Sequence, residues 1–179
     1  MNSQVSGTSV GLTAVALDYE VCGTGPALLL LHGFPQNRAI WQPVKDVLSK
    51  HFTLVMPDLR GYGASPKPAS DPEHLTYSKR AMALDLIALM DRLGHQQFGV
   101  VGHDRGARVA HRLAADHGSR ITRLMLLDIS PTLAMYEQTD MTFAAGYWHW
   151  FFLIQAHPLP ERLIGEQPIF FMNEFMVKR

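Results

Sequence analysis

The stretch Val100-Val101-Gly102-His103-Asp104-Arg105-Gly106-Ala107-Arg108 joins an apolar strand to a helix through a very short turn. A Gly-x-nucleophile-x-Gly pattern between a strand and a helix is a nucleophile elbow, here with Asp104 at the nucleophile position. Gly102 and Gly106 are expected because bulky side chains would not fit beside so sharp a turn. An aspartate at this position attacks carbon directly and leaves an ester that water must cleave. The alternative for an isolated motif is an ordinary turn in which Asp104 caps the helix.

Strands and helices are expected to alternate through the first part of the chain. Continuous apolar runs predict buried strands at 27–31, 52–56, 98–101 and 121–127. Helical patterns are predicted at 37–50, 77–93 and 104–117. Ser78 is the expected N-cap of the second of these helices, and Gly94 its C-terminal stop. This alternation is typical of an α/β fold with a mainly parallel sheet flanked by helices.

The remaining segments divide the chain into a core over 1–131 and a partial helical cap over 132–179. Within the core, two short strands or a hairpin are expected at 10–21, and a long surface loop at 57–72. Within the cap, a long aromatic-rich helix is expected over 133–155, followed by one or two short helices. A helical insertion at this point is expected to cover the carboxyl ends of the strands, where α/β sheets bind ligands.

Composition excludes several classes of function. Lys plus Arg and Asp plus Glu number 16 each, so nothing in the charge predicts a nucleic-acid or anionic-membrane partner. The single cysteine, Cys22, cannot form a disulfide within the chain and suits a reducing compartment. The first nine residues lack the pattern of a secretion signal, and the longest apolar run is too short to span a bilayer. We therefore expect a cytoplasmic protein.

Three motifs together resemble the α/β-hydrolase superfamily in order and spacing: His32-Gly33-Phe34-Pro35, Asp58-Leu59-Arg60-Gly61-Tyr62-Gly63-Ala64-Ser65 and Gly102-His103-Asp104-Arg105-Gly106. An aspartate nucleophile restricts the resemblance to haloalkane dehalogenases, epoxide hydrolases and haloacetate dehalogenases. Two arginines beside the nucleophile and the segment Tyr147-Trp148-His149-Trp150 make the chain most similar to haloacetate (fluoroacetate) dehalogenases. The resemblance extends from about residue 25 to about residue 165. It implies hydrolysis of a haloacetate to glycolate and halide, without a metal or an organic cofactor.

In this resemblance Asp104 is the nucleophile, and Arg105 and Arg108 hold the substrate carboxylate. A guanidinium binds a carboxylate in two-point geometry, which lysine does less well. The arginines would also be unusual as solvent-exposed residues without a function, because cations in the first turn of a helix oppose its dipole. The backbone N–H of Phe34 matches a donor to the oxyanion, joined by the N–H of Arg105. Asp128 matches the acid that orients the catalytic histidine, although a turn aspartate would look the same in sequence.

The resemblance assigns His149 and Trp150 to the departing halide, as N–H donors that stabilise its growing negative charge. By position alone, Trp148 is placed as well as Trp150, and an aromatic stripe of this kind is more often packing surface. His32 is expected to shape its loop rather than to take part in the reaction.

The catalytic histidine of the superfamily should follow Asp128, after the cap and the last strands. After Asp128 the sequence contains just His149 and His157, and both lie in cap-like sequence. We therefore expect a C-terminally truncated chain without the last strands of the sheet, so that the strand at 121–127 is left as an exposed apolar edge. In such a chain Asp104 would be alkylated once, and the resulting ester would not be hydrolysed.

Two other functions remain open at this point. An epoxide hydrolase shares the aspartate nucleophile and uses cap tyrosines as acids, and Tyr136 and Tyr147 are available for that role. The alternative from another class is a catalytically dead remnant that binds a ligand without turnover. The expected partner is a small haloacid, and the resemblance also allows for a homodimer.

Overall fold

The computed structural model describes residues 13–174 of the chain. The chain divides into two compact units, Met1–Ser130 and Pro131–Arg179, and each is described by itself. No helix among the described residues is long and apolar enough to cross a membrane.

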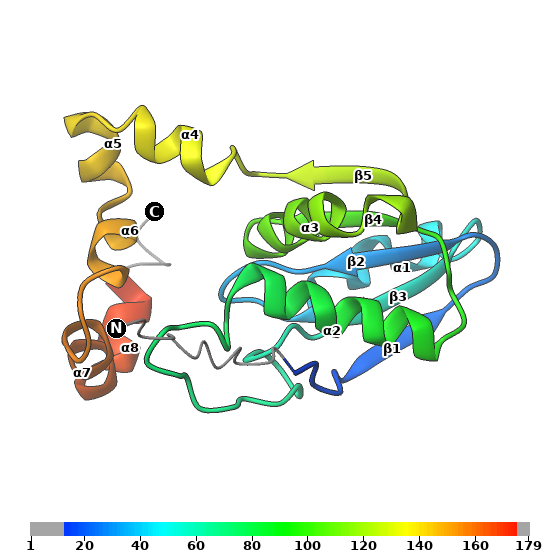
Figure 1. The fold of residues 1–179 in the computed structure, drawn as a ribbon, viewed down its shortest axis with the longest axis horizontal. Coiled ribbons are helices and arrows are strands. Elements are labelled where there is room, and N and C mark those ends of the chain that lie inside the picture. Colours follow the sequence, from blue (N-terminus) through cyan, green and yellow to red (C-terminus); the bar gives the residue numbers. More distant parts are fainter. Residues whose placement is uncertain (1–12, 175–179) are drawn as a thin grey trace, which may run out of the picture. The chain divides into compact units, whose positions relative to one another are not determined.

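The first unit is built on a sheet with the strand order β1-β3-β2-β4-β5 (Figure 1). The strands are β1 (Tyr19–Cys22), β2 (Ala27–Leu31), β3 (Thr53–Pro57), β4 (Phe98–His103) and β5 (Ile121–Leu127). β1 pairs with β3 in antiparallel orientation, and the other pairs are parallel. The predicted α/β class with a mainly parallel sheet is therefore confirmed.

Helices cover both faces of this sheet (Figure 1). They are η1 (Arg38–Trp41), α1 (Gln42–Leu48), α2 (Lys79–Arg92), α3 (Arg105–Asp116) and η2 (Gly118–Arg120). Because side chains alternate along a strand, Leu29 and Leu31 of β2 join the core under α2 and α3, while Leu30 packs with Trp41 on the other face. The Ser78 hydroxyl accepts a hydrogen bond from the N–H of Ala81, which confirms Ser78 as the N-cap of α2.

Two expectations for the first unit were wrong. Residues 13–18 form no strand, so the described part of the predicted hairpin is β1 alone; residues 10–12 lie outside the described range. The predicted surface loop at 57–72 begins inside the protein, because Asp58, Arg60 and Ser65 are buried. Each of these polar groups makes hydrogen bonds there, which composition alone does not reveal.

The second unit consists of short helices. These are α4 (Thr132–Glu137), α5 (Met141–Gly146), α6 (Trp148–Leu153), α7 (Leu159–Glu166) and α8 (Pro168–Met172). The single long helix predicted over 133–155 is wrong, because Asp140 caps a new helix by accepting a hydrogen bond from the N–H of Phe143. Asp140, before α5, and Gly146, at its end, are the residues in the sequence that indicate where the helix is interrupted. The last five residues, which ended the predicted 161–179 helices, lie outside the described range.

Strand β5 is the edge of the sheet in the described residues and is exposed along its length. The exposed fractions of Leu124, Met125, Leu126 and Leu127 lie between 36% and 56%. Four consecutive exposed residues mean that both faces of the strand lack cover. This matches the predicted exposed apolar edge.

Candidate active site

Asp104 occupies the turn between β4 and α3 in a strained backbone conformation. Its φ is 48° and its ψ is −115°, and its side chain makes no capping hydrogen bond to α3. A non-glycine residue at positive φ costs free energy, and such strain is concentrated at functional sites. The alternative that Asp104 is an ordinary helix cap is therefore wrong, and the turn has the geometry of a nucleophile elbow.

Close backbone approaches explain the glycines of this turn. A Cβ on Gly102 would lie 2.6 Å from the Cα of Ala107, and a Cβ on Gly106 would overlap the carbonyl oxygen of His32. Gly33 has the same constraint, because its Cβ would lie 2.7 Å from the Cβ of Asp104. The prediction that side chains do not fit beside the turn is confirmed.

The loop that follows β2 reaches the Asp104 carboxylate. The backbone N–H of Phe34 donates a hydrogen bond of 2.9 Å to Asp104 Oδ1. When an aspartate is the nucleophile, the oxyanion forms on its own carboxyl group. Water attacks the carbonyl carbon of the ester formed there, and the carbonyl oxygen takes the negative charge. The Phe34 N–H therefore lies where an oxyanion donor would be needed, and it contacts Oδ1 rather than Oδ2.

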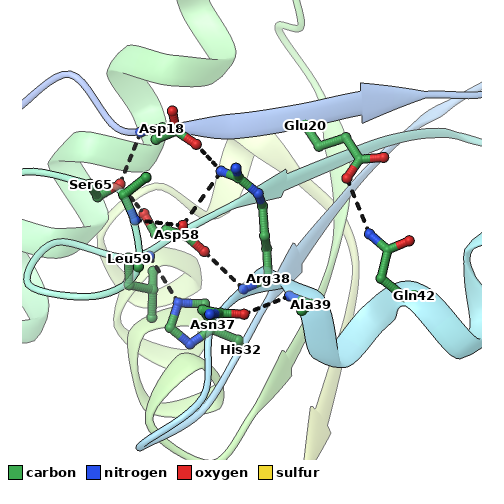
Figure 2. Close-up of polar contacts among 12 residues, drawn as sticks. Asp18, Glu20, His32, Asn37, Arg38, Ala39, Gln42, Asp58, Leu59 and Ser65 are labelled. Carbon is green, nitrogen blue, oxygen red and sulfur yellow. Dashed lines mark hydrogen bonds and ion pairs between the residues drawn. The ribbon is translucent and has the colours of Figure 1, made fainter.

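Buried polar groups hold this loop against the loop that follows β3 (Figure 2). Asp58 Oδ1 accepts from the N–H of Arg38 at 2.9 Å, and its carbonyl oxygen accepts from the Ser65 hydroxyl at 2.6 Å. His32 accepts the N–H of Leu59 on Nε2 at 3.0 Å, while its Nδ1 lies 2.9 Å from the carbonyl of Gly33. Burial lowers the pKa of His32, which favours this neutral tautomer.

The role expected for His32, shaping its loop, is confirmed by these bonds. The role of Asp58 was missed, because a buried aspartate after a strand has the same sequence signature as an exposed turn residue. Together the two side chains fix the loop that carries Phe34.

Arg105 and Arg108 occupy the first turn of α3, directly after Asp104. The N–H of Arg108 donates to the carbonyl of Asp104 at 3.1 Å, and its guanidinium donates to the carbonyl of Ser130 at 3.2 Å. The charge of Arg105 also acts on Tyr62 and on Lys79. Two arginines therefore follow Asp104 within the first turn of α3.

Asp128 lies just past the end of β5, beside the elbow. Its carboxylate is 3.8 Å from Nε2 of His103, and its side chain is 85% exposed. The Nδ1 atom of His103 is buried and has no hydrogen-bond partner among residues 13–174. Nothing in the sequence predicted that Asp128 would lie near His103, the residue directly before Asp104. The parallel register that pairs His103 with Leu127 explains it.

Two further titratable groups belong to this neighbourhood and were missed from the sequence. Burial raises the pKa of the half-buried Tyr62, an effect that the charge of Asp104 reinforces and that of Arg105 opposes. Lys79 is the first residue of α2, and its pKa is lowered to about 8, first by burial and then by the charges of Arg105 and Arg108. Neither residue adjoins Asp104 in sequence, so packing alone brings them there.

His149 and Trp150 lie on α6 of the second unit. His149 is buried, with its ring centroid 5.9 Å from that of Tyr147 and 6.1 Å from that of Trp148. Trp150 packs against Tyr136 at 5.7 Å, whereas Trp148 packs against Phe152. Both tryptophans therefore belong to the aromatic cluster of this unit. Their assignment to a halide remains a prediction.

The model of the alpha/beta hydrolase fold family matches residues 26–174 of this chain. The chain belongs to the α/β hydrolase fold family. A crystal structure of an α/β hydrolase from Nostoc sp PCC 7120 is 53% identical and superposes with a TM-score of 0.86, over 90% of this chain and 56% of that chain.

Two curated relatives carry different names. A fluoroacetate dehalogenase from Burkholderia sp is 51% identical over 154 residues, which are 86% of this chain and 51% of that protein. A soluble epoxide hydrolase from Corynebacterium sp. (strain C12) is 37% identical over 133 residues, which are 74% of this chain and 45% of that protein. The chain therefore spans about half the length of the curated relatives it matches.

Proposed function

We propose that this α/β hydrolase uses Asp104 to displace halide from a haloacetate, the first half of its hydrolysis to glycolate and halide. The observation that carries the proposal is the strained Asp104, whose Oδ1 is held by the Phe34 N–H while two arginines follow in the next turn. The identity to a fluoroacetate dehalogenase supports the same substrate class. His149 and Trp150 are proposed as donors to the departing halide.

In the first step Oδ2 of Asp104 attacks the α-carbon, so that a C–O bond forms as the carbon–halogen bond breaks and halide leaves with the bonding electrons. The hydrogen bond from Phe34 fixes the other carboxylate oxygen and so orients the attacking one. Arg105 and Arg108 would hold the substrate carboxylate by charge-assisted hydrogen bonds.

In the second step water attacks Cγ of the Asp104 ester, the carbonyl oxygen becomes an oxyanion beside the Phe34 N–H, and glycolate leaves as the carboxylate re-forms. This step needs a base for the attacking water. Asp128 is proposed as the acid that orients such a base. For this 179-residue polypeptide we expect the second step to be slow, because neither His149 nor His157 matches that base in sequence.

The test is halide release from chloroacetate, counted against protein concentration, with the intact mass measured on the same sample. We expect one equivalent of halide and a gain of one carboxymethyl group located on Asp104. Asp104→Asn should abolish both, because an amide is a poor nucleophile, while leaving the circular dichroism spectrum unchanged. Release well beyond one equivalent would contradict the expected stall. No release and no adduct would contradict the proposed function.

Epoxide hydrolysis is the second candidate, favoured by the identity to a soluble epoxide hydrolase. It would use the same Asp104 and would need an acid for the epoxide oxygen, for which Tyr136 and Tyr147 are candidates. Incubation with a small neutral epoxide separates the two reactions. A hydroxyalkyl adduct on Asp104, without any carboxymethyl adduct from chloroacetate, would favour this reading.

A further inference from the structure

Two aspartates with strained backbones follow neighbouring strands of the sheet. Asp104 follows β4 with a φ of 48°, and Asp128 follows β5 with a φ of 58°. Positive φ is unfavourable for a residue with a side chain, and such strain is concentrated where function requires it. The N–H of Asp104 donates to the carbonyl of Leu127 at 3.1 Å, so the two strand ends are fixed to each other.

His103, the last residue of β4, lies between these two aspartates. Its Nε2 atom is 3.8 Å from Oδ2 of Asp128. On the other edge of the ring, Nδ1 lies 2.9 Å from the point where a Cβ on Gly33 would be, and Oδ1 of Asp104 lies 2.9 Å from the same point. The two atoms are therefore no more than twice that distance apart. The imidazole thus has one nitrogen near each carboxylate.

The Nδ1 atom of His103 makes no hydrogen bond within the part of the chain that the structure describes, although it is buried. Burying a polar atom without a partner lowers stability. His32, the other histidine beside Gly33, shows the contrast, because both of its ring nitrogens lie at hydrogen-bond distance from a partner. An unpaired buried nitrogen of this kind calls for an explanation, and a catalytic role is one of the few available.

The position of Asp128 favours one tautomer of the neutral imidazole. A carboxylate beside Nε2 favours the proton on that atom, so Nδ1 keeps its lone pair. A lone pair near the nucleophile, with a carboxylate on the far side of the ring, is the arrangement of a general base oriented by an acid. The remaining titratable neighbour is His32, which burial keeps neutral, so it adds no charge that would oppose protonation of His103.

We propose that His103 is the base that activates water against the ester formed on Asp104, and that Asp128 holds it in the tautomer that this step requires. The inference rests on the proposed function, whose second step needs a base. In this role His103 is a catalytic residue, and Asp128 is a positioning residue that acts through it.

In this step Nδ1 accepts a proton from water as the water oxygen bonds to Cγ of the ester. The carbonyl electron pair moves to Oδ1, beside the Phe34 N–H. When the carbonyl re-forms, the bond between Cγ and Oδ2 breaks, and Oδ2 leaves with the electron pair as the hydroxyl oxygen of glycolate, taking the proton from Nδ1. The new carboxyl group of Asp104 then loses its remaining proton to solvent.

The burial of Nδ1 also sets the speed of this step. Water reaches a buried atom slowly, so the ester should be lost much more slowly than it is formed. One equivalent of halide is therefore released before hydrolysis becomes measurable.

The experiment follows the loss of the ester itself. Each protein is incubated with chloroacetate until the carboxymethyl adduct on Asp104 is complete, the reagent is removed by gel filtration, and the intact mass is recorded over time from pH 5 to pH 9. The variants are His103→Gln and Asp128→Asn. The matched control is His111→Gln, which removes an exposed imidazole from α3.

The wild type should lose its adduct at a rate that rises between pH 5 and pH 8 and then levels off, because a histidine changes from imidazolium to free base in this range. His103→Gln should be about a hundredfold slower at pH 7.5, a contribution typical of general base catalysis. Its remaining rate should rise with the hydroxide concentration. His111→Gln should stay within about twofold of the wild type. Equal rates in the wild type and His103→Gln would overturn the proposal.

Asp128→Asn provides a second test, which does not depend on the folding of His103→Gln. Asparagine tolerates positive φ, so the change removes the charge and keeps the backbone conformation. Without a carboxylate beside it the imidazolium is less stable, so the rise in rate should move to lower pH, and the plateau should fall because the ring is no longer held. A pH profile and plateau identical to those of the wild type would also overturn the proposal.

The adduct separates this inference from the proposed function. If chloroacetate forms the adduct and its loss does not depend on His103, the first step holds and the role of His103 fails. If chloroacetate forms no adduct, but a small epoxide leaves a hydroxyalkyl ester on Asp104 that the wild type loses faster than His103→Gln, the base holds and the dehalogenation proposal fails. If neither reagent modifies Asp104, both fail.

Discussion

Asp104 has a φ of 48°, a conformation that stability alone would not select. Other residues fix the loops of this part of the protein. Gly63 is one example: its φ is 48°, and a Cβ there would overlap the Asp58 carboxylate, which accepts the N–H of Ala64 at 2.9 Å. The site thus depends on a glycine that never contacts the reacting atoms.

Gly63→Ala should destabilise the fold by at least about 3 kcal/mol, because the strain of positive φ adds to the displacement of Asp58. Gly94→Ala is the matched control: its φ is 80°, but a Cβ there meets no atom within 4 Å. It should cost about 1 kcal/mol from backbone strain alone. Urea unfolding of both variants measures the difference. Equal losses would show that Asp58 does not restrict position 63.

Lys79→Met should be more stable than the wild type at pH 7, and the gain should shrink toward pH 10. The folded pKa of Lys79, about 8, lies below its ordinary value of 10.5, so between these values the unfolded chain binds a proton that the folded chain does not. Wild-type stability therefore rises with pH across this window relative to the variant. Denaturant midpoints at pH 7 and pH 10 test the sign. A variant less stable at pH 7 would mean that the charged lysine is satisfied in the fold.

At the scale of elements, a buried ion pair connects the loop after β3 to helix α2. Arg60 donates to both carboxylate oxygens of Asp85, at 2.9 Å and 2.6 Å, and both side chains are buried. The same guanidinium donates to the carbonyl oxygens of Thr76 and Thr13. This group therefore sets where α2 begins relative to the sheet, and with it the position of Lys79.

Arg60→Ala should destabilise the fold by about 3–5 kcal/mol, because it leaves the Asp85 carboxylate buried without its partner. The control is Arg112→Ala, which removes an exposed ion pair between two residues of α3, Arg112 and Asp116. This change should cost about 0.5 kcal/mol or less. Thermal unfolding monitored by circular dichroism distinguishes them. A small loss for Arg60→Ala would show that water reaches Asp85 and replaces the arginine.

At the scale of the whole molecule, strand β5 is an exposed apolar edge of the described sheet. Its outer backbone groups have no strand partner within residues 13–174, and its apolar side chains are exposed on both faces. Exposed edges of this kind template pairing between chains.

Met125→Lys should raise the protein concentration at which the chain self-associates, because a charge on an edge strand opposes edge-to-edge pairing. Met125 is 56% exposed, so the change should leave stability nearly unaltered. Leu133→Lys is the control, since Leu133 is 70% exposed but lies outside the sheet. Light scattering over a concentration series provides the measurement. Equal effects of both variants would assign the change to net charge rather than to the edge.

Local patterns were sufficient for much of the fold. The apolar runs, the Ser78 cap and Gly102 depend on neighbours in sequence, so they could be predicted. Gly106 was predicted from its motif, although the atoms that leave no room for a Cβ there belong to Leu31 and His32. The break at Asp140 was missed because aromatic spacing continued through it. The first strand of the hairpin predicted at 10–21 is absent over the described residues 13–18, because β-branched composition does not say whether a strand finds a pairing partner.

The sequence by itself determined the α/β class, the family motifs and the elbow position of Asp104, because each can be recognised from residues close together in the chain. The tertiary structure decided which distant groups act on that carboxylate, namely the Phe34 N–H, the Lys79 cation and the uncharged phenol of Tyr62, and it brought Asp128 to His103. The reason is physical. Hydrogen bonds and charge interactions act over a few ångströms in space, and only the packing of the sheet and helices sets those distances.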